Sequence, residues 1–158
     1  MVMKLDIKKL LKNLAIPLLI GFIAGFLTRQ GTENFALNVK QPPFAPPAAL
    51  FPIVWTILYA LMGFSAYIIE NSPQTSQRNR ALVLYYIQLF FNFLWSFIFF
   101  NFNNYLAAFV WIIALLILII ATTIEFYKIK PIAGYLMIPY ILWVSFAAVL
   151  NFSIYLLN

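Results

Sequence analysis

Three apolar stretches of the sequence carry indole, phenol and amide side chains at the spacing of one helix face. Steps of three, four, seven and eight residues bring side chains to the same side of a helix. Indole rings stack on flat apolar molecules, and an amide in hydrocarbon needs a hydrogen-bonding partner. The pattern therefore predicts an interior cavity for a flat hydrophobic ligand. The candidate residues are Trp55 and Tyr59 in the first stretch, Asn92 and Trp95 in the second, and Trp143, Ala147 and Asn151 in the third.

Packing between helices is the alternative explanation for the same stripes. Small residues such as Gly63 and Ala66 let helices approach closely, and amides join neighbouring helices inside a bilayer. Because three similar stripes occur in one chain, we prefer the shared cavity. Gly21 and Gly25 add a further close-packing face, which could pack within the bundle or between subunits.

The residue types that most enzymes and metal sites use are scarce. The chain has no Cys and no His, which excludes thiolate and imidazole metal ligands and histidine bases. Its acids lie at the ends of apolar runs or in polar segments, so no firm catalytic residue and no metal site is predicted. An ion-coupled transporter is disfavoured for the same reason, since it needs charged groups along its path. The four acids are Asp6, Glu33, Glu70 and Glu125.

The composition assigns these stripes to membrane-spanning helices. Hydrophobic residues make up 65% of the 158 residues and charged residues only 9%, whereas soluble domains carry about a quarter charged residues. Long continuous apolar runs exclude the alternating strands of a membrane barrel. We predict an all-α integral membrane bundle of five transmembrane helices, forming a single domain over residues 1–158. The predicted spans are 11–27, 51–69, 82–100, 106–124 and 132–157, with one long loop at 29–50.

The basic residues predict how the bundle is oriented. Five spans place the N-terminus and the second and fourth connections on one side, with eight of the ten Lys and Arg residues. The positive-inside rule then puts the N-terminus in the cytoplasm and the C-terminus outside. Basic residues at the ends of apolar runs speak against nucleic-acid binding, which needs a clustered basic face. The first run resembles a signal peptide, but Arg29 closes it and no cleavage site follows, so we expect a retained helix.

The long connection contains a proline-rich segment, Gln41-Pro42-Pro43-Phe44-Ala45-Pro46-Pro47. Proline fixes φ and stiffens the chain. One interpretation is a rigid lead-in to the second helix. The other, which we prefer, is a lid over a cavity between the helices.

Several ordered motifs resemble the translocator protein family (TspO/MBR), also called the tryptophan-rich sensory proteins, whose animal members are the peripheral benzodiazepine receptors. The likeness covers nearly the whole chain and includes the number of helices and the loop lengths. The motifs are Pro42-Pro43-Phe44-Ala45-Pro46-Pro47, Phe51-Pro52-Ile53-Val54-Trp55-Thr56-Ile57-Leu58-Tyr59, Phe91-Asn92-Phe93-Leu94-Trp95-Ser96, and Pro139-Tyr140-Ile141-Leu142-Trp143 with Phe146-Ala147 and Leu150-Asn151.

The resemblance implies a homodimeric five-helix bundle with a ligand pocket beneath the first loop. It implies a receptor or carrier for porphyrin-type tetrapyrroles such as protoporphyrin IX, bound as a ligand, without a resident cofactor. A light-dependent porphyrin-degrading enzyme, with Trp55 and Trp143 implicated, is the first alternative. A structural partner of other membrane proteins is the second. Carried over by motif position, the pocket residues are Pro46, Trp55, Asn92, Trp143 and Ala147.

The chain departs from the family pattern at three positions. Gln41 precedes Pro42 where the family often has Lys, and Phe44 stands where Trp is frequent. The cholesterol motif needs a basic residue soon after a Tyr near the C-terminus, and Tyr155 has none, so cholesterol binding is unsupported. The Lys-, Asn- and Ile-rich composition favours a microbial cell membrane.

Overall fold

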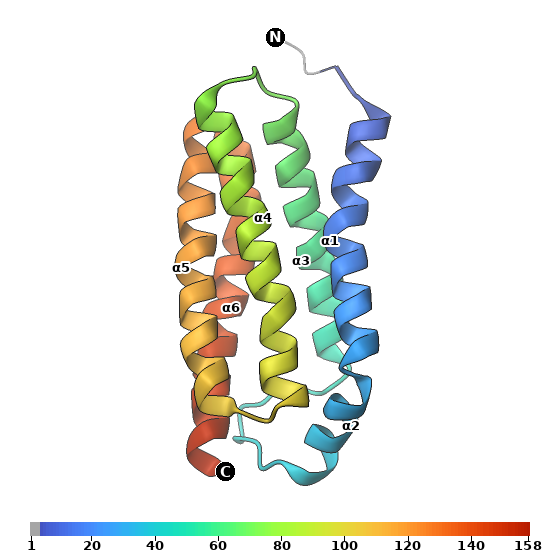
Figure 1. Cartoon of the computed structure of the whole chain (residues 1–158), viewed down its shortest axis with the longest axis vertical. Helices are drawn as coiled ribbons and strands as arrows, with labels where there is room; N and C mark the ends of the chain where they lie inside the picture. The colour runs from blue at the N-terminus through green and yellow to red at the C-terminus, as the bar shows by residue number, and fades with distance from the viewer. Residues whose placement is uncertain (1–3) are drawn as a thin grey trace.

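The computed structural model describes residues 4–158, and five of the helices in this part are long and apolar enough to cross a membrane. This confirms the predicted all-α membrane bundle. The spanning helices are α1 (Ile7–Leu27), α3 (Leu50–Glu70), α4 (Ser76–Ser96) continued by the π-helical turn η1 (Phe97–Asn101), α5 (Tyr105–Ile129) and α6 (Pro131–Leu157). They run side by side along the long axis, with the start of α1 and the end of α6 at opposite ends of the bundle (Figure 1).

Polar side chains cap the N-terminal ends of three of the spanning helices. The Asp6 carboxylate accepts the Lys9 N–H of α1 at 3.1 Å, and the Thr75 hydroxyl accepts the Arg78 N–H of α4 at 3.1 Å. Asn104 accepts the Ala107 N–H of α5 at 3.0 Å. These caps satisfy N–H groups that lack a partner within the first helical turn. Asn103 turns the chain between η1 and α5 in the left-handed region, with φ 51°.

The connection at 29–50 differs from the loop that the sequence analysis predicts. Its first part forms a helix, α2 (Arg29–Asn38), and residues 39–49 join α2 to α3. The Phe35 ring holds α2 against η1, with ring centres 5.3 Å from Phe99 and 5.5 Å from Phe100. Because α2 is short and mostly polar, it is held in place mainly by this contact between residues far apart in the sequence. Hydropathy along the chain does not reveal such a contact.

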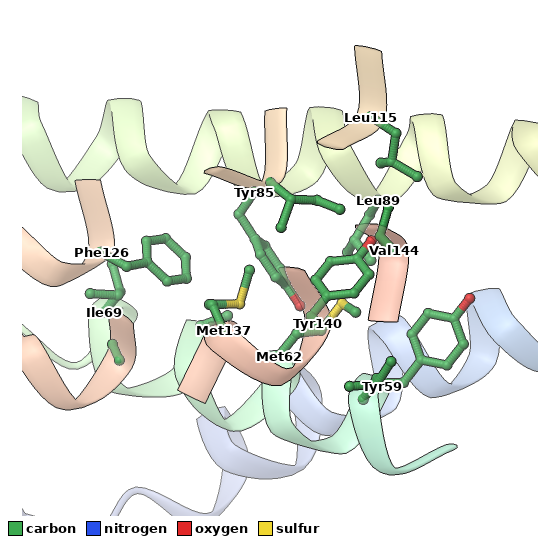
Figure 2. Close-up of a cluster of buried hydrophobic side chains, with 14 of the residues drawn as sticks. Tyr59, Met62, Ile69, Tyr85, Leu89, Leu115, Phe126, Met137, Tyr140 and Val144 are labelled. Carbon is green, nitrogen blue, oxygen red and sulfur yellow. The ribbon is translucent and has the colours of Figure 1, made fainter. Parts of the chain in front are cut away.

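The core lies where α3, α4, α5 and α6 meet. Tyr140 and Met137 of α6 lie among Met62 of α3, Leu89 of α4 and Leu115 of α5 (Figure 2). Large side chains of all four helices are fully buried here and exclude lipid and water from the centre. Helix α1 packs against the other side of α3.

Glycine allows the close approach of α1 and α3. A Cβ atom added to Gly63 would lie 2.5 Å from the backbone oxygen of Asn13, and one added to Gly21 would overlap the ring of Tyr59. Gly25 has open space beside it within the chain. The Gly21 side of the predicted small-residue face therefore packs inside the bundle.

A charged cluster joins α1, α3 and α4 at the end that carries the N-terminal residues. The Glu70 carboxylate accepts hydrogen bonds from the Lys12 ammonium and from the side-chain amide of Asn13. Arg78 donates to the backbone oxygens of Glu70 at 3.1 Å and Ser72 at 3.0 Å. This carboxylate, which the sequence places at the end of an apolar run, therefore joins α1 to α3.

Candidate functional site

The polar stripes of α3, α4 and α6 meet in one buried chain of hydrogen bonds. The Tyr59 hydroxyl donates to Asn92 Oδ1 at 2.7 Å, and Asn92 Nδ2 donates to the Tyr140 hydroxyl at 2.8 Å. Tyr140 in turn donates to Gln88 Oε1 at 2.8 Å. Each of these groups would be costly if it were left unpaired in hydrocarbon. The Asn92 amide is thus already occupied by two tyrosines.

A second polar group links α4, α5 and α6 nearer the proline-rich segment. Trp95 Nε1 donates to Asn151 Oδ1 at 3.2 Å, and Asn151 Nδ2 donates to the backbone oxygen of Tyr105 at 2.8 Å. The Trp95 ring stacks on Phe99, with ring centres 4.9 Å apart. Asn151 and Trp95 therefore fasten helices together, as the packing interpretation of the stripes predicts.

Trp55 covers the buried tyrosines. Its ring stacks on Tyr59 at 5.5 Å between centres and meets Tyr140 edge-on at 6.2 Å. Such pairs stabilise packing beyond their buried area. Trp55 is half-buried, so part of its surface is still accessible.

A groove of about 550 Å³ lies between α3 and α6, beneath the segment that precedes α3. Its size falls within the range of small-molecule sites. Ile57 and Leu142 on its walls are 54% and 66% exposed, so the groove opens sideways on the face that meets lipid. The lining residues are Pro46, Val54, Ile57, Leu58, Leu61, Pro139, Leu142, Trp143 and Phe146.

Trp143 is the one lining side chain with a hydrogen-bond donor. Its ring lies against Phe51 at 5.7 Å and Phe146 at 5.6 Å between centres. Its Nε1–H is buried and has no hydrogen-bond partner among residues 4–158. A buried donor without a partner is costly, and an acceptor atom that reached it would remove that cost.

Two turns shape the segment at 39–49. The Ala45 N–H donates to the backbone oxygen of Pro42 at 3.0 Å, and the Leu50 N–H donates to that of Pro47 at 2.9 Å. Phe44 meets Phe146 of α6 edge-on, with ring centres 6.4 Å apart. These contacts bring Pro46 to the groove and join this segment to the wall formed by α6.

The predicted site residues divide into two groups. Pro46 and Trp143 line the groove, and Ala147 is buried one turn beyond Trp143 on the same helix. The aromatic and amide residues nearer the bundle centre instead contact one another. This second group consists of Trp55, Tyr59, Asn92, Trp95 and Asn151.

The sequence pattern does not distinguish the apolar wall of the groove on α3. The wall consists of residues at helical spacing: Val54, Ile57, Leu58 and Leu61. The same pattern of aliphatic residues is expected on the side of a spanning helix that faces lipid. Only their position opposite Trp143 and Phe146 distinguishes them, and this position comes from tertiary structure.

Comparison with known proteins gives a consistent assignment. The sequence model of the TspO/MBR family matches residues 13–157. The chain is 42% identical over 155 residues to the Tryptophan-rich protein TspO of Archaeoglobus fulgidus, covering 98% of this chain and 99% of that protein. It is 30% identical over 132 residues to the Translocator protein of Homo sapiens, covering 82% and 78% of the two chains. This integral membrane protein therefore belongs to the TspO/MBR family.

Proposed function

We propose that this protein is a membrane receptor or carrier that binds a porphyrin-type tetrapyrrole, such as protoporphyrin IX, in the groove between α3 and α6. A porphyrin is flat and largely apolar, with carboxylates at one edge. The groove offers an apolar wall from α3, an indole from α6 and a proline-rich segment above them. Membership of the TspO/MBR family supports the same class of ligand.

The observation that carries the proposal is the unpaired Nε1–H of Trp143. Once the side chains that cover it move aside, this N–H can donate to a carboxylate of the ligand while the indole ring contacts the macrocycle. Among the pocket residues predicted from the sequence, Asn92 is the one whose amide could also serve as a polar anchor. Because Asn92 is held by Tyr59 and Tyr140, we assign the anchor to Trp143.

Titration of the purified protein in detergent with protoporphyrin IX, followed by porphyrin absorbance, tests the proposal. We expect saturable binding in the micromolar range or tighter. Trp143→Phe keeps a ring but removes the donor, and should weaken binding by about tenfold. Trp111→Phe is the matched control, because the Trp111 N–H is used by the Phe91 backbone oxygen on α4. Absence of saturable binding by the wild-type protein would refute the proposal.

A light-dependent reaction on the bound porphyrin is the second candidate. The stacking of Trp55 on Tyr59 favours it, because it places two oxidisable rings in contact. Illumination of the complex in air separates the two functions. A new product that disappears in the Trp55→Phe, Trp143→Phe double variant would indicate an enzyme, whereas bleaching at the rate of free porphyrin would leave binding alone.

A further inference from the structure

The chain that joins α2 to α3 is attached to the far end of α6 by a single side chain. Asn158 Oδ1 accepts the Lys40 N–H at 3.0 Å, and Asn158 Nδ2 donates to the Lys40 backbone oxygen at 2.9 Å. The same Nδ2 also donates to the Ile154 oxygen at 2.8 Å. We call the two bonds between Asn158 and Lys40 the Asn158 clasp.

An asparagine side chain suits this arrangement for a chemical reason. It carries one acceptor and one donor group, as a peptide unit does. Paired with the N–H and C=O of one residue, it satisfies both backbone groups as a neighbouring strand would. Aspartate lacks the donor, and alanine lacks both groups. The bond to Ile154 orients the amide toward Lys40.

The clasp joins the end of α6, the helix that carries Trp143 of the groove, to the segment that carries Pro46. Trp143, Ala147, Ile154 and Asn158 are separated by four, seven and four residues, which keeps them along one side of the helix. Lys40 is six residues before Pro46, and the chain between them contains two prolines and the turn from Pro42 to Ala45. Because this stretch is stiff, a movement of Lys40 also moves Pro46.

We propose that Asn158 is a positioning residue that holds residues 39–49 closed over the groove and thereby sets how fast the ligand leaves. The inference rests on the proposed binding function. Both partners of the clasp are exposed, so water can replace its bonds. The segment is then held to α6 by the contact of Phe44 with Phe146, which must also separate when it opens. A closed segment keeps Pro46 on the ligand, while an open one uncovers that end of the groove.

Two measurements on the full chain test the clasp. The first is amide hydrogen exchange over residues 39–49 without ligand, and the second is the dissociation rate of protoporphyrin IX. Asn158→Ala should raise both rates by about fivefold, and Asn158→Asp should raise them too, since it lacks the donor. Asn38→Ala is the control, because the Asn38 side chain is exposed and donates only to Asn34 Oδ1. The control should leave both rates unchanged.

The outcomes separate the clasp from the proposed function. Unchanged exchange in Asn158→Ala would overturn the clasp. Faster exchange with an unchanged dissociation rate would overturn its role in positioning. If the wild-type protein does not bind protoporphyrin IX, the proposed function fails, and the exchange result alone then decides whether Asn158 holds the segment.

Discussion

At the scale of single residues, the buried amides hold the helices together. No water is available at the middle of a bilayer, so each amide and hydroxyl there must find a partner in the protein. Asn92 has Tyr59 on one side and Tyr140 on the other, and Asn151 has Trp95 and a backbone oxygen. The indole N–H of Trp143 differs from them because it has no partner among residues 4–158.

The two hydrogen bonds of Asn92 to tyrosines predict the effect of replacing it. Asn92→Leu leaves the Tyr59 hydroxyl without its acceptor and removes a donor to Tyr140, so the free energy of unfolding should fall by about 1–3 kcal/mol. Thermal or denaturant unfolding in detergent measures the change, with the exposed Asn38→Leu as the control. Unchanged stability together with lost porphyrin affinity would instead show that Asn92 is a ligand contact.

The sequence was sufficient to find the aromatic and amide stripes but not to assign their partners. A side chain such as Asn92 has the same spacing whether it faces a ligand or a tyrosine of another helix. Pro46 and Trp143 were predicted and do line the groove, while Leu58 and Leu61 were not predicted because aliphatic residues are also expected toward lipid.

At the scale of elements, the sequence predicts the five spans within a few residues, because a helix that crosses hydrocarbon needs about 20 apolar residues. Helices α1 and α6 end at Leu27 and Leu157, as the first and last predicted spans do, and the largest difference is α4, which begins at Ser76, before the apolar run. Helix α2 and the turn η1 were missed. Their contact through Phe35, Phe99 and Phe100 joins distant parts of the chain, and no local periodicity encodes it.

The contact between α1 and α3 gives the prediction at this scale. Gly63→Ala places a methyl group 2.5 Å from the Asn13 backbone oxygen, so the helices must separate and stability should fall by about 1–3 kcal/mol. Gly25→Ala, on α1 itself, meets nothing within 4 Å and should change stability by no more than about 1 kcal/mol. Unfolding in detergent measures both variants. Equal effects would show that α1 and α3 are not held at this distance.

At the scale of the whole molecule, the two ends of the bundle differ in the residues and elements that they carry. One end carries Lys12, Glu70 and Arg78, which tie α1, α3 and α4 together. The other end carries α2, residues 39–49 and the end of α6 (Figure 1). Residues 39–49 therefore cover the groove at this second end of the bundle, which holds few basic residues. The positive-inside rule predicts that this end faces away from the cytoplasm.

Cysteine labelling of intact cells tests this orientation. The chain has no native Cys, so Gln41→Cys and Gln77→Cys each introduce a unique target. An impermeant maleimide should label the exposed position 41 in intact cells, and position 77 only after the membrane is permeabilised. Gln77 is half-buried in the first turn of α4, so Gln74→Cys, exposed in the connection just before this helix, confirms that protection comes from the membrane rather than from packing. Labelling of positions 74 and 77 but not 41 in intact cells would reverse the orientation and place the clasp and the covered end of the groove in the cytoplasm.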